Sequence, residues 1–575
     1  MAPSQSVLSL TLGLLATVGL AKEKAVDEAK AAELYDSGII HNEIMQAKMS
    51  QWKMERESGV RDSELYPELG YAECINGWVE AIPGDRNNTF RCSNMDLYHF
   101  ISHGAMGSSG AGSSSWGWVS DDGREFIAIG QEDGTTFAEI SSEGKLVVLA
   151  RLPQVSSPSD WREIRSYKNY MIIGSEAAGH GIQIFDMTKL LDIDVDASGV
   201  VIYDALDDLT GYTNDLPAGR SHNVVVNEEK DYIVAVGAQP RTDECLSGLI
   251  FFDVSDPSDP VRLGCAAGDG YVHDAQCIVY RGPDKRYDGR DICYGYNEDS
   301  LTIYDVTDKA NVTNIISRTS YFGVNYTHQG WVDDPMNQQF LFMNDERDER
   351  FQAGPSFDSF PVVYVWDIRD LENPKQTGTF KYPTRSIDHN LYIKDGIMFQ
   401  SNYGNGYSLL DVSGVGPNDV EGKSICQAAW FDCYPEDDNL PGGGVVAFVG
   451  SWSSYGWFPS GYHFINTIER GAFVVKPTSL KCPPPPKCNA DNCLRAMRAS
   501  HIDGRLEESQ EFCAEYTANL VTEVQALPAY ATSACQGDAV SRVSSACDCL
   551  PTIENPQTPC IPSLGIGCEG VTGPW

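Results

Sequence analysis

Residues 248–264, GLIFFDVSDPSDPVRLG, predict a strand, a turn and the start of a second strand. Residues 249–252 are a short apolar run, and the Ser, Asp and Pro residues that follow Asp253 are typical of turns. Asp253 can cap the end of the first strand by accepting hydrogen bonds from turn amides. Variants of this unit recur along the chain, so the stretch predicts the architecture of most of it.

Six units end an apolar run with an acidic residue, at Glu139, Asp186, Asp253, Asp305, Asp367 and Asp411. Successive acidic residues are 47, 67, 52, 62 and 44 positions apart, and residues 471–475 resemble a seventh, truncated copy. A period of about 40–60 residues with several strands per copy is typical of a β-propeller. We therefore expect an all-β protein, a seven-bladed β-propeller with an N-terminal helical segment and a small disulfide-rich C-terminal tail domain.

Changes in composition divide the chain into four parts. Residues 1–21 are predicted to be a secretory signal peptide, because an apolar run is followed by small residues at the cleavage spacing. Residues 22–92 are expected to contain the helical segment and a disulfide loop. Residues 93–479 are expected to form the propeller, and residues 480–575 a proline-rich linker and a cysteine-rich tail.

Helical spacing is found near both ends of the chain. Met45, Met49 and Trp52 fall on one face of a predicted helix. This helix would be a lid or brace on the main domain, or a mobile arm like a propeptide. Phe512, Tyr516 and Leu520, at a spacing of four, predict one helix within the tail.

Charge and cysteine content indicate the compartment. The net charge of −39 argues against nucleic acid or an anionic membrane as a partner. Seventeen cysteines and glycosylation sequons at Asn87, Asn311 and Asn325 favour a secreted glycoprotein, extracellular or in the cell wall. No apolar run is long enough to be a transmembrane segment.

The cysteine spacing predicts disulfides and not a zinc site, because no pair of CxxC motifs occurs. Four pairs are close enough in sequence to bridge a small loop or neighbouring strands: Cys74 with Cys92, Cys245 with Cys265, Cys277 with Cys293, and Cys426 with Cys433. An odd number of cysteines leaves one thiol over.

A second recurrence marks the start of each repeat, and four of these positions carry histidine: His222, His273, His328 and His389. The first strand of every blade lines the channel of a propeller, so we expect the four imidazoles to converge near one mouth. Neutral imidazole suits iron, copper or zinc, which makes this a candidate axial metal site. In the alternative interpretation, histidine is a consensus residue that bonds a backbone carbonyl of the neighbouring blade.

The residues next to these histidines are candidate supporting groups. Asn223, Asp274, Gln329 and Asp388 could fix the ring tautomers, although adjacent residues of a strand point to opposite faces. Trp116, Trp161 and Trp331 near the blade starts could stack on a ligand, with packing in the core as the alternative.

Residues 344–350 form an acidic stretch directly after a predicted strand. Clustered carboxylates on a loop suit calcium. The spacing is not that of an EF-hand and two arginines dilute the charge, so a solvated loop is the favoured interpretation.

Several segments resemble the secreted LVIVD-repeat propellers of the choice-of-anchor B family: SSWGW at 114–118, HDAQC at 273–277, YTHQGW at 326–331 and IDHNLY at 387–392. The resemblance extends over about residues 74–476 and implies an extracellular, fungal-type propeller. The cysteine-rich tail stands where the family has varied surface anchors. The resemblance implies no catalytic residue.

The sequence thus favours a secreted binding or scaffold module that recognises an extracellular carbohydrate, a protein or a cell-wall component. The alternative is a metal-dependent extracellular enzyme, oxidative or hydrolytic, that works at the histidine cluster. The cofactor would be iron, copper or zinc, or calcium. No Walker lysine, GxSxG elbow or HExxH motif occurs, so no catalytic residue is predicted.

Overall fold

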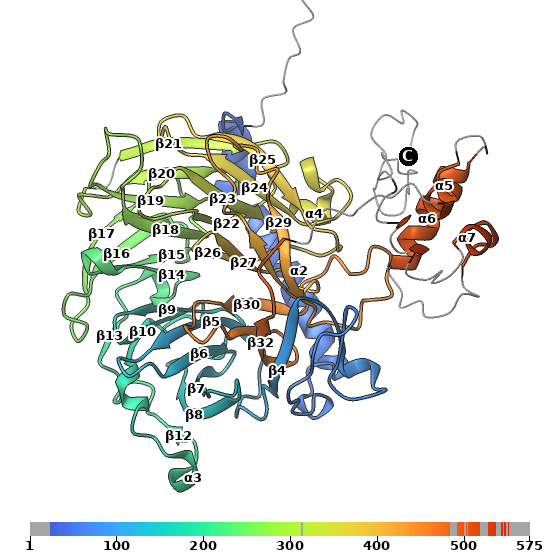
Figure 1. The fold of residues 1–575 in the computed structure, drawn as a ribbon. Coiled ribbons are helices and arrows are strands. Elements are labelled where there is room, and N and C mark those ends of the chain that lie inside the picture. The colour runs from blue at the N-terminus through green and yellow to red at the C-terminus, as the bar shows by residue number, and fades with distance from the viewer. Residues whose placement is uncertain are drawn as a thin grey trace, which may run out of the picture.

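The computed structural model describes residues 23–311 and 314–482, and in the tail residues 492–499, 502, 504–517, 527–535, 542–543, 546–547 and 550. The predicted signal peptide lies outside the described residues. Seven sheets of four to six strands surround a central axis (Figure 1), which confirms the predicted seven-bladed propeller.

Four blades come from the first half of the propeller, and each is given from its inner to its outer strand. The first contains β5 (Gly112–Val119), β6 (Glu125–Gln131), β7 (Gly134–Ile140) and β8 (Leu146–Pro153), with β12 (Val201–Ile202) added in parallel. The second contains β9 (Arg162–Tyr167), β10 (Tyr170–Ser175), β11 (Ile182–Asp186) and β13 (Gly211–Thr213). The third contains β14 (Asn223–Asn227), β15 (Tyr232–Val236), β16 (Leu249–Asp253) and β17 (Val261–Ala266). The fourth contains β18 (Asp274–Val279), β19 (Asp291–Tyr296), β20 (Leu301–Asp305) and β21 (Asn314–Tyr321), edged by β1 (Glu23–Lys24).

The remaining three blades complete the ring. The fifth contains β22 (Thr327–Val332), β23 (Phe340–Asp345), β24 (Val362–Asp367) and β25 (Lys375–Lys381). The sixth contains β26 (Leu391–Lys394), β27 (Ile397–Ser401), β28 (Tyr407–Asp411) and β29 (Cys426–Phe431), extended by β3 (Thr89–Ser93) and β2 (Trp78–Glu80). The seventh contains β30 (Ser451–Tyr455), β31 (His463–Thr467) and β32 (Gly471–Pro477), and its outer strand is β4 (Met95–Ser102) from the N-terminal side.

The recurring acidic residue does cap its strand, as the sequence predicts. At Asp186, Asp253, Asp305, Asp367 and Asp411, one carboxylate oxygen accepts a hydrogen bond of 2.8–3.1 Å from the backbone N–H two residues later. Such Asx turns end the third strand of the second to sixth blades and redirect the chain toward the fourth strand. Glu139, with its longer side chain, instead pairs with Arg124 at 2.7 Å.

Three predicted disulfides are present, Cys74–Cys92, Cys245–Cys265 and Cys277–Cys293, but the pairing of Cys426 with Cys433 is wrong. Cys426 bonds Cys482 and so ties the linker to β29, while Cys433 is a buried free thiol. The reason is geometric. Cys426 begins β29 and Cys433 follows its end, so an extended strand separates them by about 20 Å.

The described tail contains α5 (Asn492–Met497), α6 (Arg505–Thr517) and α7 (Ala529–Ala534). α6 confirms the predicted helix for Phe512 and Tyr516, while Leu520 lies outside the described residues. The disulfides Cys493–Cys535 and Cys513–Cys547 staple these helices, as expected for a small domain with little core of its own.

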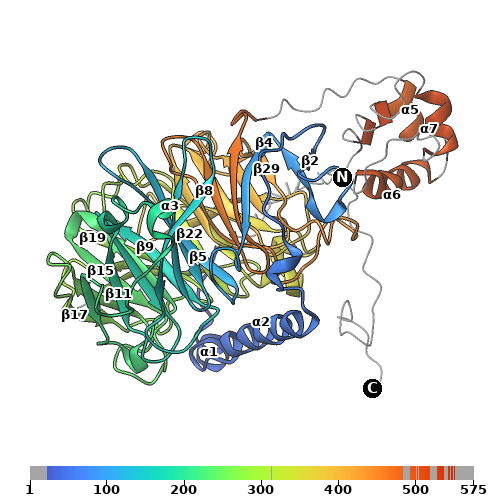
Figure 2. The same ribbon diagram turned by 90° about the horizontal axis from the view of Figure 1, so that it is seen from below.

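The N-terminal helix lies along one face of the propeller (Figure 2). A short α1 (Glu28–Lys30) leads into α2 (Ile39–Ser58). The predicted stripe is wrong in part, because Met49 is 46% exposed and the buried residues are Ile40, His41, Ile44, Lys48 and Trp52. Trp52 is fully buried and fixes the rotation of the helix, which turns Lys48 inward. Among the described residues, no helix is both long and apolar enough to cross a membrane.

His103 makes a pH-dependent contribution to stability that can be measured. It is buried beside the seventh blade, where Nε2–H donates to the Thr467 carbonyl (2.8 Å) and Nδ1 accepts from the Gln131 amide (3.0 Å). Burial lowers its pKa to about 4. Between pH 6.5 and 4, His103 is therefore protonated in the unfolded chain but not in the folded protein. The free energy of unfolding falls as the pH falls through this window.

We expect the difference in unfolding free energy between wild type and His103→Gln to shrink by about 3 kcal/mol from pH 7 to pH 4, because the variant lacks this titration. Denaturant titrations at several pH values would measure it. A difference that does not change with pH would contradict the assignment.

Candidate metal centre

The four histidines of the blade starts come together around the axis. His222 and His273 directly precede β14 and β18, His328 is in β22, and His389 precedes β26. Successive ring centroids lie 4.2, 4.2 and 4.6 Å apart. The first strands of four consecutive blades therefore place the four imidazoles in one continuous arc.

Hydrogen bonds fix three of these rings in the same tautomer. Nδ1 of His273 donates to the carbonyl oxygen of His328 (2.8 Å), and Nδ1 of His389 to that of Trp452 (2.6 Å). Nδ1 of His222 donates to a carboxylate oxygen of Glu176 (2.5 Å). Carbonyl and carboxylate oxygens only accept, so Nδ1 carries the proton and Nε2 keeps its lone pair. Metal-binding histidines are typically held in this way.

Two unprotonated Nε2 atoms face one another in the arc of histidines. Nε2 of His222 lies 2.7 Å from Nε2 of His273. With both Nδ1 atoms protonated, two lone pairs would point at each other, unless an additional proton or a cation lies between them. Two nitrogens bound to one ion, with bonds of about 2.0–2.1 Å, would lie about 2.9 Å apart at right angles and about 3.3 Å apart in the tetrahedral geometry of zinc.

Glu346 joins the histidines from the turn between β23 and α4 (Asp348–Phe351). The prediction of a solvated loop at residues 344–350 is therefore wrong, because Glu346 is fully buried. One of its oxygens, Oε1, lies 2.6 Å from Nζ of Lys48 and accepts from the Tyr403 hydroxyl (2.5 Å). Its other oxygen, Oε2, has no hydrogen-bond partner among the described residues and lies 3.9 Å from Nε2 of His328.

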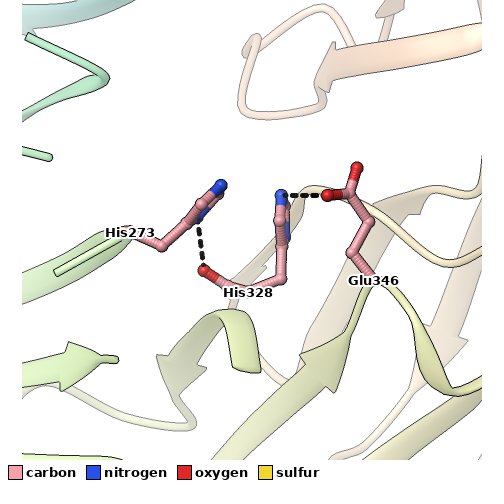
Figure 3. A group of neighbouring side chains, drawn as sticks. All are labelled: His273, His328 and Glu346. Carbon is pink, nitrogen blue, oxygen red and sulfur yellow. Dashed lines mark hydrogen bonds and ion pairs between the residues drawn. The ribbon is translucent and has the colours of Figure 1, made fainter. Parts of the chain in front are cut away.

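His273, His328 and Glu346 form a possible ligand set, with one donor atom of each within 4.8 Å of the others (Figure 3). Burial lowers the pKa of His328 to about 4, so this imidazole is neutral at pH 7. Burial alone would raise the pKa of Glu346, but the Lys48 ammonium overrides it and the pKa falls to about 2. Two neutral imidazoles and an ionised carboxylate are ligands that zinc and iron accept.

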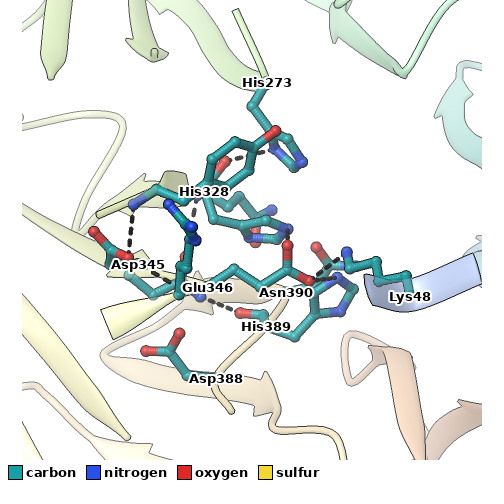
Figure 4. A network of polar contacts seen from close by, with 12 residues as sticks. Lys48, His273, His328, Asp345, Glu346, Asp388, His389 and Asn390 are labelled. Carbon is teal, nitrogen blue, oxygen red and sulfur yellow. Dashed lines mark hydrogen bonds and ion pairs between the residues drawn. The ribbon is translucent and has the colours of Figure 1, made fainter. Parts of the chain in front are cut away.

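α2 closes the mouth of the channel over this cluster. The Trp52 ring packs between Trp161 (5.2 Å) and Trp452 (5.7 Å), and its Nε1–H donates to the Phe448 carbonyl (2.8 Å). Lys48 reaches inward from α2 to Glu346 and His389 (Figure 4). The cavity that remains among the histidines is about 20 Å³, which is room for one water molecule or one ion.

Three of the four candidate residues next to the histidines accept hydrogen bonds from backbone N–H groups and not from the imidazole rings. Asn223 and Asp274 each accept from the next backbone N–H in their own strand, at 2.7 Å. Oε1 of Gln329 accepts from the backbone N–H of Leu391 (2.7 Å). Neither carboxylate oxygen of Asp388 has a hydrogen-bond partner among the described residues, and burial raises its pKa well above the ordinary value.

The three candidate tryptophans lie in aromatic packing. Trp161 is covered by α2, as described above. Trp116 and Trp331 pack on Tyr392 further along the channel, at 5.0 and 5.3 Å. Trp116 is 5% exposed and Trp331 is half-buried. Stacking of these rings on a ligand stays a prediction.

Glu346, Lys48 and Glu176 are the site residues that sequence reasoning missed. Glu346 sits in a stretch so rich in acidic residues that no single one stands out. Lys48 gives a usable signal, because it lies at helical spacing between Ile44 and Trp52, on a face that is otherwise apolar. Glu176 has no signal in its local sequence.

Comparison with known proteins identifies no family. No family model matches the sequence. A relative, protein transport protein SEC31 from Pyricularia oryzae, is 23% identical over 284 residues. The match covers 46% of this chain but only 19% of the relative, so the chain spans about a fifth of that protein's length. The resemblance to the choice-of-anchor B family therefore stays a prediction.

Lys48 and Glu346 are expected to be strongly coupled in stability. Their side chains are almost fully buried, so Lys48→Met leaves a buried carboxylate without its counter-ion. We expect a loss of about 3–5 kcal/mol of unfolding free energy in chelator-treated protein. The double variant Lys48→Met/Glu346→Gln should recover much of it, because no lone charge remains.

Denaturant unfolding of the two single variants and the double variant would measure this coupling. Lys53→Met is the matched control, since Lys53 is exposed on the same helix and pairs only with Glu57 at 3.8 Å. Its effect should stay within about 0.5 kcal/mol. Additive losses in the double variant would contradict the coupling.

Proposed function

We propose that this chain is an extracellular binding or scaffold propeller that holds a transition-metal ion on its axis. His273, His328 and Glu346 would bind the ion, and His222 and His389 would flank it. The observation that carries the proposal is the convergence of one donor atom each from His273, His328 and Glu346 within 4.8 Å of one another in a buried site. A cation bound to Nε2 of His273 would also take up the lone pair that otherwise faces Nε2 of His222, 2.7 Å away.

Zinc, iron or copper suits the ligand set better than calcium. Imidazole nitrogens predominate in it, whereas calcium binds oxygen ligands. The free oxygen Oε2 of Glu346 is available to the ion while Oε1 stays with Lys48. The carboxylate can thus bind the ion through Oε2 while it pairs with Lys48 of α2 through Oε1.

The closed cavity supports a binding or scaffold role over catalysis. Its volume of about 20 Å³ accepts an ion but no organic substrate. A metal-dependent oxidative or hydrolytic enzyme is the second candidate, because two histidines and one carboxylate form the ligand set of many non-haem iron oxygenases. That function would require α2 to leave the mouth of the channel.

The cellular setting is part of the proposal. The described residues contain six disulfides, which indicates an oxidising environment. Asn87 and Asn311 are exposed and suited to glycosylation, while Asn325 is half-buried. The partners would be an extracellular carbohydrate, a protein or a cell-wall component. Membership of the choice-of-anchor B family agrees with this setting.

Metal analysis of the purified full chain tests the axial site. We expect about one equivalent of zinc, iron or copper per chain, and at least a tenfold loss of metal affinity in His273→Ala/His328→Ala, because two of the three ligands are removed. Nitrogen hyperfine coupling in the electron paramagnetic resonance spectrum of copper-loaded protein would report the imidazoles directly.

His99→Ala is the matched control, since His99 lies on β4 and pairs with Glu68 (2.9 Å), away from the axis. Its metal content should equal that of the wild type. Folded wild-type protein that carries no transition metal and cannot be loaded with one would refute the axial site.

A further inference from the structure

A second buried cluster of acidic residues lies at the periphery of the propeller, in the segment that follows β29. Asp432, Asp437 and Asp438 are each at most 2% exposed. One carboxylate oxygen of each lies within 4.8 Å of the others. The cluster is distinct from the axial site, because it contains oxygen donors and no histidine.

The positive charge in contact with the cluster does not balance it. Nε of Arg91, from β3, lies 2.7 Å from Asp438 and 3.5 Å from Asp432. Three carboxylates against one guanidinium leave a local charge of −2 if all three are ionised. The cluster therefore needs either shared protons or a cation with two charges.

Asp437 provides a second observation that points to a ligand. Its Oδ2 accepts from the backbone N–H of Val445 (2.9 Å), but its buried Oδ1 has no hydrogen-bond partner among the described residues. Leaving a buried carboxylate oxygen unpaired is costly. An unpaired oxygen that converges with two other carboxylates is an available donor for a cation.

We propose that Asp432, Asp437 and Asp438 bind a calcium ion. Calcium is favoured because the donors are all oxygens and because three ionised carboxylates against one guanidinium leave a charge of −2 for the ion to balance. The neighbouring Cys433 does not make this a soft-metal site. Its thiol is fully buried, and its sulfur is not among the donor atoms that converge at the cluster.

The ion can be reached from outside. Asp438 and Asn439 line a cavity of about 1040 Å³, whose other wall includes Tyr71, Trp78 and Arg86. This opening admits the ion and the waters that complete its coordination. Calcium here would fix the segment after β29 against β3 and so stiffen one wall of the cavity.

Binding can be tested on the wild-type full chain after treatment with a chelator. Trp430 lies close to the cluster, since its ring centroid is 5.0 Å from the guanidinium carbon of Arg91. We expect terbium to show luminescence on tryptophan excitation, and calcium to displace it. Calorimetric titration with calcium should give a saturable heat of binding. Calcium should also raise the melting temperature above the value measured in the presence of the chelator.

The variant Asp437→Asn keeps the shape of the side chain and removes one charge. It should lose at least tenfold in calcium affinity, together with the sensitised terbium signal and the calcium-dependent rise in melting temperature. Asp259→Asn is the matched control, because Asp259 is an exposed turn residue of the third blade. It should behave as the wild type.

Three results would overturn the proposal. The first is wild-type protein with neither calcium heat nor a calcium-dependent melting shift. The second is a terbium signal that survives Asp437→Asn, which would place the ion elsewhere. The third is a melting temperature that rises on acidification and is insensitive to calcium, which would show that the carboxyls share protons. None of these results depends on the axial histidines, so the two proposed sites are tested independently of each other.

Discussion

Pairing of β4 with β32 is the constraint on which the rest of the structure depends. It places residues 95–102 beside residues 471–477 in one sheet and so closes the ring of blades. Closure removes the exposed edges that an open row of sheets would present. It also sets the distance of every inner strand from the axis. Histidines that are 51, 55 and 61 residues apart in sequence thereby reach ring separations of 4.2–4.6 Å. The axial cluster is thus a product of the closed ring and of no single blade.

The lid and the axial cluster depend on one another through a buried ion pair. An ammonium group is costly to bury unless a carboxylate meets it. Lys48 meets Glu346 only when α2 lies in one register across the mouth of the channel. An apolar residue at position 48 would let the helix slide or rotate at little cost, whereas the ion pair penalises every other register. Trp52 adds apolar area in the same register, because it fills the space between Trp161 and Trp452. Packing and charge therefore select the same arrangement.

The sequence predicted the features that repeat and missed those that occur once. The Asx-capped strand ends and the blade-start histidines recur at similar spacing, so their common environment could be inferred. Glu346 comes from a turn between strands of the fifth blade and meets Lys48 almost 300 positions earlier, a contact that no local pattern encodes. The acidic stretch at 344–350 has the composition of a solvated loop, and it is buried because α2 covers the mouth of the channel. Cys426 was paired with the nearer cysteine because sequence distance cannot show that β29 holds the two apart.

The two proposed cation sites differ in the interaction that would attract the ion. At the axis, Lys48 already balances Glu346, and burial keeps His273 and His328 neutral by lowering their pKa values, so a metal would be held by nitrogen lone pairs and not by uncompensated charge. At the cluster of Asp432, Asp437 and Asp438, one arginine faces three carboxylates, so charge balance is the main attraction. A net charge of −39 does not remove this need, because surface charges are screened by water and salt while buried ones are not. We therefore expect a cation at the axis to be held by nitrogen lone pairs, and a cation at the periphery by the charge of buried carboxylates.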